Sequence, residues 1–472
     1  MHRLKYSPTL FHNRQLTQRP NSRLLLVLTI LIFANLGTAF AANHFVRAGA
    51  TGNGSGSDWT NACTDFTGSC AVASLVRGDT YYVATGNYAG RTFNTPTSGT
   101  LRITIKGATV ADHGSNLGWS DSLSVCSTQA TWTNAWTVST QFWVFDSQCY
   151  PPSPLHADGN DPTKYGFTVR DASACSGDIT NIDIGAANIT LKGISMTNPC
   201  ATPPGGTQHY FGVHFNTGGS EAGYVFSHNY GENYCADYQG RGGPGPSSPL
   251  IEYHYSKGAW STDNCHGEIT AFGGSGATIR YNYFDQCQGT ACIASDGPSM
   301  SAFKIYGNVM NNVTNGGTGC GSGGNGAIAG AGNASITNFE IYNNTIIQPG
   351  MCFGWFYSNG GGGNVAKNNI IKGNCDFTGS LTHDSNYYLS CNSGQAAPAE
   401  TNSQMSSTAP FVNMTARDFH LSADTNMWAP VTSPFDIDPD GLPRTSSRGA
   451  FQFSTVTAQR PAAPQSLQAT VR

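Results

Sequence analysis

A short β-type phrase that usually closes on Asn recurs through the middle of the chain. Copies of this phrase occupy residues 189–194, 224–229, 250–254, 277–282, 303–308, 339–344 and 364–369. With the last residue of each copy as its anchor, the successive spacings are 35, 25, 28, 26, 36 and 25 residues. Repeats of this length indicate a solenoid, a propeller or an array, and the variable spacing does not fit the fixed periods of propellers or ankyrin repeats.

Each repeat has room for about three short strands between Gly- and Asn-rich turns, and no helix-period stretch separates them. We therefore predict a parallel β-helix, in which strands of successive coils stack about 4.8 Å apart and equivalent residues form columns. The column three residues before each anchor is apolar and is expected to face the core. Its members are Leu191, Phe226, Ile251, Ile279, Ile305, Ile341 and Ala366.

Charged residues and the anchors should follow the same stacking. Glu252 should lie beside Arg280, and Lys304 beside Glu340, as ion pairs on a solvated face. The anchor Asn residues are expected at a bend, where Asn tolerates left-handed backbone and its amide can bond the amide of the next coil. This structural role is favoured over a role in ligand binding.

The composition suits one long all-β domain. The chain has 472 residues with 57 Gly, and 11% of it is charged against a usual ~25%. Because a solenoid grows in one dimension, its length does not require division into domains. We expect the β-helix domain with its capping segments over residues 42–455 and a flexible tail over 456–472.

Residues 1–41 have the composition of a secretory signal peptide. They hold five basic residues, no acidic residue and an apolar run from Leu24 to Ala34, so cleavage near Ala41 is expected. The alternative is an uncleaved membrane anchor over Leu24–Ala42. After cleavage, 19 basic residues would face 28 acidic ones, a net charge near −9. This charge argues against nucleic-acid binding, and we expect no membrane contact and a monomer.

All 14 Cys residues follow the expected cleavage point. An even number of Cys in an exported chain favours disulfides, so the prediction is a secreted or extracellular protein. Cys63 with Cys70, and Cys287 with Cys292, are close enough in sequence to staple single loops. The connectivity of the other Cys residues stays open.

Both ends of the chain resemble a known superfamily. The segments His44–Trp59 and Arg77–Tyr88 resemble the opening of the pectate-lyase-like right-handed β-helix superfamily, and Asp418–Ser422 with Asp440–Phe453 resembles its closing segment. The resemblance covers residues 44–453. It implies an all-β, right-handed single-stranded parallel β-helix (solenoid) and says little about activity.

The central coils also resemble those of pectate lyases, but the catalytic motif does not. The family's acidic calcium ligand would fall at or beside Thr270, and its catalytic Arg has no counterpart in residues 299–335. Calcium is the one cofactor that the sequence suggests, through the alternating carboxylates of Asp436–Gly441. The Glu that should close such a loop is replaced by Ser447, so a turn is the preferred interpretation.

Three polar residues near the centre of the chain are the catalytic candidates: Asp263, His266 and Glu268. A His and a carboxylate can act as general acid and base on a glycan, and alternation along a strand would let His266 and Glu268 point outward together. The alternative is that they bond loop backbone or each other. The expected substrate-binding residues are His214, Asp296 and Trp355, with Trp355 as a stacking platform for a sugar ring or, alternatively, a core residue.

The function predicted from these features is a secreted β-helix protein that acts on an extracellular polysaccharide. The reaction would be that of a lyase or a glycoside hydrolase, with the substrate in a groove along the coils. The alternative is a non-catalytic glycan-binding, adhesion or structural cell-surface protein.

Overall fold

The structure is a computed structural model, and the chain divides into Met1–Ala41 and Ala42–Arg472. The structure describes residues 41–455 except 155–157, 172–174, 176, 201–207, 218–220, 241–244, 260–266, 288, 290, 297–298, 313–325, 332–333, 349–353, 393–394 and 427–428. Within these described residues, no helix is both long and apolar enough to cross a membrane. The signal-peptide and tail predictions lie outside them.

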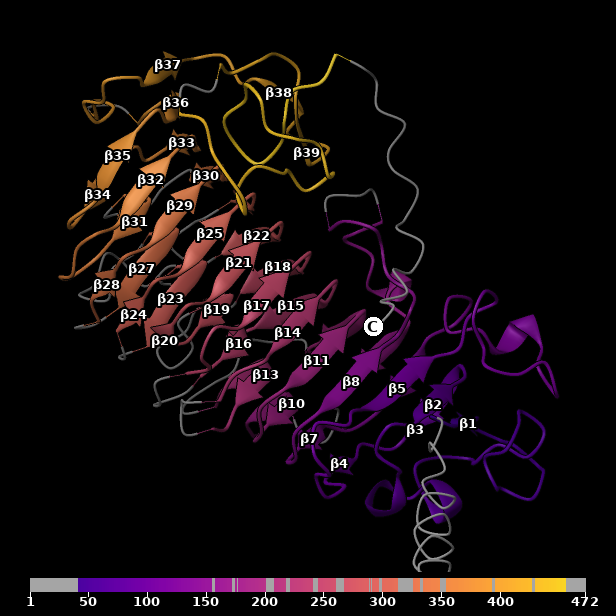
Figure 1. The fold of residues 1–472 in the computed structure, drawn as a ribbon. Coiled ribbons are helices and arrows are strands. Elements are labelled where there is room, and N and C mark those ends of the chain that lie inside the picture. The colour runs from indigo at the N-terminus through magenta and orange to yellow at the C-terminus, as the bar shows by residue number, and fades with distance from the viewer. Residues whose placement is uncertain are drawn as a thin grey trace, which may run out of the picture. The chain divides into compact units, whose positions relative to one another are not determined.

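Three long parallel sheets, here named A, B and C, build the domain (Figure 1). Sheet A contains β1 (Asn43–Val46), β2 (Thr80–Val83), β5 (Ile103–Gly107), β8 (Trp143–Asp146), β11 (Ile189–Lys192), β14 (Val225–Ser227), β17 (Leu250–Glu252), β21 (Thr278–Arg280), β25 (Lys304–Tyr306), β29 (Glu340–Tyr342), β32 (Val365–Lys367) and β35 (Thr382–Asp384). Sheet B contains β3 (Gly86–Tyr88), β6 (Ala130–Trp132), β9 (Phe167–Val169), β12 (Ile194–Thr197), β15 (Tyr230–Tyr234), β18 (Tyr255–Ala259), β22 (Tyr283–Cys287), β26 (Val309–Asn311), β30 (Thr345–Gln348), β33 (Ile370–Gly373), β36 (Tyr387–Leu389) and β37 (Gln404–Ser406). Sheet C contains β4 (Thr92–Phe93), β7 (Trp136–Val138), β10 (Ile179–Ile184), β13 (Tyr210–Phe215), β16 (Ala236–Gln239), β19 (Thr270–Ala271), β23 (Ile293–Asp296), β27 (Ile328–Ala331), β31 (Phe356–Tyr357) and β34 (Phe377–Thr378).

The chain visits the sheets in the order C, A, B within each central coil. From β13 in sheet C it passes to β14 in sheet A, to β15 in sheet B and back to β16 in sheet C. Every pair of neighbouring strands in these three sheets is parallel, so the fold is the predicted single-stranded parallel β-helix.

The remaining described elements are short. A three-stranded sheet contains β20 (Gly274–Ser275), β24 (Met300–Ser301) and β28 (Ile336–Thr337), and an antiparallel hairpin contains β38 (Phe411–Asn413) and β39 (Asp418–Leu421). The helical structure of the described residues is limited to four short 3-10 turns, η1 (Gly68–Cys70), η2 (Val72–Ser74), η3 (Asp121–Leu123) and η4 (Pro162–Lys164).

The predicted inward column is confirmed along sheet A. Each member is the register partner of the next, from Leu191 beside Phe226 to Ile341 beside Ala366. All seven side chains are at most 1% exposed. The apolar repeat in the sequence is therefore the core of the coil stack, since burial of this column removes its side chains from water.

The outward neighbours of this column also follow the predicted register. Glu252 pairs with Arg280 on the next coil, with 2.6 Å between Oε2 and Nη2. Lys304 and Glu340 are register partners on adjacent strands. The predicted ion pair is therefore confirmed for Glu252 and Arg280. The predicted adjacency is confirmed for both pairs.

The anchor Asn residues form a buried ladder at the bend between sheets A and B. Asn308 Oδ1 accepts hydrogen bonds from the backbone N–H and the side-chain amide of Asn282, at 3.0 and 2.9 Å. Its own Nδ2 donates to Ile279 O at 2.8 Å and to Asn344 Oδ1 at 2.9 Å. The side chains of these anchor residues are 0% exposed. The ladder thus satisfies backbone groups that the bend removes from the sheets.

One detail of the Asn prediction is wrong. The left-handed residue is the one before each anchor, as shown by His228 (φ 54°), Tyr253 (φ 50°) and Tyr281 (φ 59°). The positive φ of this preceding residue turns the chain, and the anchor side chain is then directed along the coil axis to its partner.

A carboxylate ends the ladder at its C-terminal side. The last Asn of the ladder is Asn386, whose Oδ1 accepts a hydrogen bond from Asn369 Nδ2 at 2.9 Å. The Oε2 of Glu400 accepts a hydrogen bond from Asn386 N at 2.9 Å, and its Oε1 accepts one from Asn386 Nδ2 at 2.8 Å. The Glu400 side chain is 0% exposed and also contacts His383 Nδ1 at 2.9 Å. Glu400 therefore supplies the acceptors that an Asn of a further coil would have supplied.

The closing segment packs on the outer face of sheet B. Phe419 and Phe451 join a buried cluster with Tyr230, Tyr255 and Tyr283, whose side chains stack from coil to coil. Arg417 Nη1 donates to Tyr255 Oη at 2.8 Å. The segment is thus fixed across several coils rather than at the end of the stack alone.

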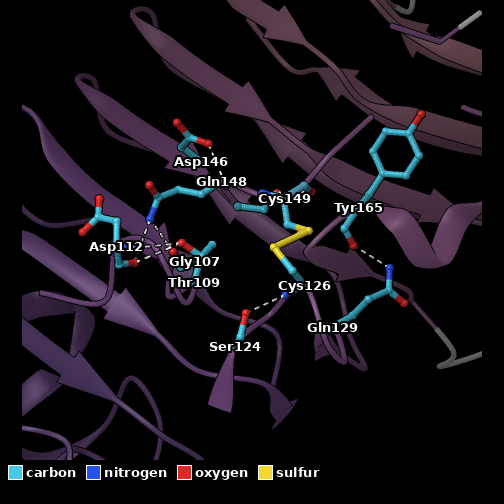
Figure 2. Close-up of a disulfide and its surroundings, with 11 residues drawn as sticks. Gly107, Thr109, Asp112, Ser124, Cys126, Gln129, Asp146, Gln148, Cys149 and Tyr165 are labelled. Atoms are coloured by element: carbon cyan, nitrogen blue, oxygen red, sulfur yellow. Dashed lines mark hydrogen bonds between the residues drawn. A yellow bond between two sulfur atoms is a disulfide. The ribbon is translucent and has the colours of Figure 1, made fainter. Parts of the chain in front are cut away.

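Disulfides staple loops of the domain. The described bonds are Cys63–Cys70, Cys126–Cys149, Cys175–Cys200, Cys287–Cys292 and Cys375–Cys391. The two predicted loop staples are therefore confirmed. Figure 2 shows the bond from Cys126 to Cys149, beside which Gln148 Nε2 donates to Gly107 O at 2.7 Å. This hydrogen bond and the disulfide hold the loop after β8 against residues of the preceding coil.

Candidate functional site

The predicted catalytic cluster is not assembled at the described surface. Asp263 and His266 lie outside the described residues. Glu268 precedes β19, and its side chain is 4% exposed, whereas Ile269 faces the core. The prediction that Glu268 points outward into solvent is therefore wrong. Its role in catalysis stays a prediction.

A bulge at the start of the sheet C strands explains where alternation fails. Ile269 O accepts hydrogen bonds from the consecutive amides of Asp237 and Tyr238, at 3.1 and 3.0 Å. In the same way, Trp355 O accepts from Ala327 N and Ile328 N, at 3.0 and 3.1 Å. Two residues on one strand thus oppose one on the next, which breaks the strict alternation of faces.

The prediction of Trp355 as a surface platform is wrong. Its side chain is 0% exposed and belongs to the main core cluster, as does that of Phe356 beside it. Tyr357 is the register partner of Ala329 in the outer column of sheet C, and its side chain is partly exposed. The aromatic residue at this outer position is therefore Tyr357. Regular alternation does not predict two consecutive core residues.

Asp296 is the last residue of β23 and the register partner of Ala331 in β27. Its side chain lies outside the described part of the structure. Its predicted role in substrate binding therefore stays a prediction.

His214 is the sequence-predicted site residue that the structure places on an accessible outer face. It lies on β13 in register with Asp183 on β10, and its Nδ1 is 2.9 Å from Asp183 Oδ1. The side chains of His214 and Asp183 are 22% and 27% exposed. Asn216 Nδ2 donates to the second oxygen of Asp183 at 3.5 Å. Asp183 is the partner that sequence reasoning missed, because the coil register places it beside His214.

The hydrogen bond to Asp183 determines what His214 can do chemically. A carboxylate accepts a hydrogen bond from Nδ1–H, which leaves the Nε2 lone pair as an acceptor in the neutral imidazole. The described residues provide no hydrogen-bond partner for Nε2. The phenyl ring of Phe211 lies 5.8 Å from the imidazole, with 19° between the ring planes. The arrangement therefore offers an oriented proton acceptor at the surface of sheet C.

The outer column of sheet C that contains His214 has polar residues in its N-terminal coils and Ala residues in the coils that follow. Thr137, Asp183, His214 and Gln239 follow one another in register across four coils. The column then continues with Ala271, Ala294 and Ala329. Thr137, Asp183 and His214 are partly exposed, whereas Gln239 is 4% exposed and the three Ala residues at most 1%. A chain-like ligand that runs along the coils at this position would therefore meet the side chains from Thr137 to His214.

A second imidazole–carboxylate pair lies inside the coil and is not accessible. His254 occupies an anchor position, with Nε2 2.8 Å from Asp237 Oδ2 and Nδ1 3.3 Å from Tyr238 Oη. Its side chain is 0% exposed and that of Asp237 is 4% exposed. Gly231 faces Asp237, because a Cβ there would lie 2.2 Å from Asp237 Oδ2. This pair is packed as part of the interior.

The suggested calcium loop forms a turn in the structure. Asp438 Oδ1 accepts hydrogen bonds from Asp440 N at 3.0 Å and Leu442 N at 2.7 Å, and its Oδ2 accepts one from Gln452 N at 2.9 Å. Burial raises the pKa of Asp438. The backbone thus uses both carboxylate oxygens. Among the described residues, no group of three or more His, Cys, Asp or Glu is placed to hold a metal ion.

Comparison with models of protein families and with curated protein sequences gives no match. Among solved structures, the crystal structure of pectate lyase Pel9A is similar at 13% sequence identity and a TM-score of 0.41. The similarity covers 88% of this chain and 98% of that one. We base no assignment of activity on this likeness.

Proposed function

We propose that the protein acts on an extracellular polysaccharide that lies along the outer face of sheet C, with His214 as the proton-transfer group. The observation that carries the proposal is the partly exposed His214–Asp183 pair, in which Asp183 is bonded to Nδ1 and Nε2 is left as the proton acceptor. The disulfides support an oxidising, extracellular location. The polar side chains beside His214 would bind sugar hydroxyl groups along the coil axis.

In this function Asp183 is the positioning residue. It would hold the imidazole in the tautomer with Nδ1 protonated and would stabilise the imidazolium formed when Nε2 takes up a proton. Such general acid–base catalysis contributes typically about 10²–10⁴-fold in rate.

A non-catalytic glycan-binding protein is the second candidate. The observation in its favour is that, after Gln239, the outer column continues as Ala271, Ala294 and Ala329. Glycoside hydrolysis generally uses a pair of carboxyl groups, and the described outer column supplies Asp183 alone. Binding without turnover is the behaviour that this candidate predicts.

The test is an activity screen of the oxidised chain, residues 42–472, on a polysaccharide panel. Both reducing ends and unsaturated products are measured, and His214→Gln is compared with His113→Gln. His113 is a suitable control because it stacks on Trp119 at 4.2 Å in an N-terminal loop outside sheet C.

The catalytic proposal predicts that His214→Gln lowers turnover at least about 10²-fold, and that His113→Gln leaves it unchanged. Equal turnover of the two variants would show that His214 is not the proton-transfer group. Binding of a glycan without turnover would establish the second candidate. Unchanged circular dichroism and unfolding midpoints must accompany either result.

A further inference from the structure

Sheet C differs from the other two sheets in its charged residues. Its ten strands contain Asp183, Asp237 and Asp296 and no Lys or Arg. Of the described carboxylates, Asp183 is partly exposed, whereas Asp237 is buried against His254. The outer face of sheet A, in contrast, carries both signs, as the pair of Glu252 and Arg280 shows. The lack of basic residues is therefore a property of the strands of sheet C and not of the fold.

The surroundings of His214 extend this acidic character. Asp178, just before β10, has a side chain that is 56% exposed and lies 3.5 Å from His209 Nδ1. Its Oδ1 accepts a hydrogen bond from His209 N at 2.7 Å. Asp178 and Asp183 thus place two exposed or partly exposed carboxylates on one coil, one at the entry of β10 and one near its end.

The charge of a bound polymer should therefore affect its affinity. Two unit charges 4 Å apart interact by about 1 kcal/mol in water and about 4 kcal/mol at an effective dielectric constant of 20. A uronate carboxylate beside Asp183 would be repelled by an energy of this order, and the strands of sheet C offer it no basic side chain. An ammonium group at the same position would be attracted.

We infer that the outer face of sheet C selects an amino-sugar polysaccharide over one that carries carboxylates. The inference rests on the proposed function, because it names the ligand class of the same site. Asp183 would accept a hydrogen bond from the ligand ammonium group through the oxygen that faces Asn216. Thr137 would bind a hydroxyl group of a neighbouring sugar.

The experiment compares three oligosaccharides of equal length: a glucosamine oligomer, its fully N-acetylated form and an oligogalacturonate. The first two differ in the ammonium charge at each sugar, so they isolate its effect. Affinities are measured by calorimetry with the oxidised chain, residues 42–472. The variants are Asp183→Asn and, as a control with the same change of charge, Glu340→Gln on the outer face of sheet A.

The glucosamine oligomer is expected to bind most tightly and the oligogalacturonate most weakly. Asp183→Asn should weaken binding of the glucosamine oligomer about fivefold, as loss of one exposed ion pair of about 1 kcal/mol implies, and Glu340→Gln should change it less than twofold. Tightest binding of the oligogalacturonate would overturn the inference. So would equal affinities for the amino and acetylated oligomers, or equal effects of the two variants.

Failure of the inference is distinguishable from failure of the proposed function. If the acetylated oligomer binds as tightly as the amino form, the charge selection is wrong and the proposed function stands. If none of the three oligomers and no polysaccharide of the panel binds, both proposals are wrong.

Discussion

Truncation of the buried amide at position 308 should destabilise the whole central stack. In Asn308→Ala, the backbone N–H of Asn282 loses its acceptor, and Asn282 Nδ2 loses one of its two acceptors and keeps Ile251 O, at 3.0 Å. A buried donor left without an acceptor costs about 1–3 kcal/mol, and a further lost hydrogen bond about 1 kcal/mol. We therefore expect a loss of about 2–4 kcal/mol in the free energy of unfolding.

The assay is guanidinium unfolding followed by circular dichroism, with Asn134→Ala as the control. Asn134 is exposed, so its truncation should change stability by less than about 0.5 kcal/mol. Because a solenoid can unfold in parts, the slope of the transition is compared as well as its midpoint. If Asn308→Ala shifted the midpoint no more than Asn134→Ala, the ladder would not be the stabilising element described above.

Three further changes test other parts of the structure. Gly231→Ala should destabilise by about 1–3 kcal/mol through overpacking, because its Cβ would lie 2.2 Å from Asp237 Oδ2; an unchanged denaturation midpoint would contradict this packing. His420 lies 2.5 Å from Asp418 Oδ1 and 2.8 Å from Asp440 Oδ2, and although burial lowers its pKa, these carboxylates raise it above the usual value. The contribution of His420 to stability is therefore complete below its unfolded pKa of about 6.5 and is lost as the pH rises through the folded pKa. The free energy of unfolding should depend less on pH in His420→Gln, and an unchanged pH dependence would refute this linkage. Trp355→Leu should lower stability by about 2–4 kcal/mol without weakening glycan binding by the folded protein, and weaker binding at unchanged stability would restore Trp355 as a ligand contact.

The sequence is sufficient to predict the coil and its register. The column from Leu191 to Ala366 is apolar at one position of every repeat, and a shift of one residue would turn this whole column toward solvent. The pairing of Glu252 with Arg280 follows from the same alignment. Glu400 could not be predicted as the end of the Asn ladder, because it lies outside the repeat and acts through its position after the last coil.

The site was less predictable, for two physical reasons. At the start of the sheet C strands the strict alternation of faces fails, since the consecutive residues Trp355 and Phe356 both face the core. Asp183 and His214 are 31 residues apart, and an irregular loop length conceals that they are register partners. His214 itself was predicted as an outward residue, which its exposure in the structure supports.

Carbethoxylation of His214 with and without a bound glycan would test the location of the site directly. The oxidised chain is treated with diethyl pyrocarbonate, and the modification of each His is followed by mass spectrometry, with His113 as the internal reference. A polysaccharide along the outer face of sheet C should slow modification of His214 and leave that of His113 unchanged. If His214 reacted at the same rate when the protein was saturated with a glycan that it binds, the ligand would lie elsewhere and the assignment of this face would be wrong.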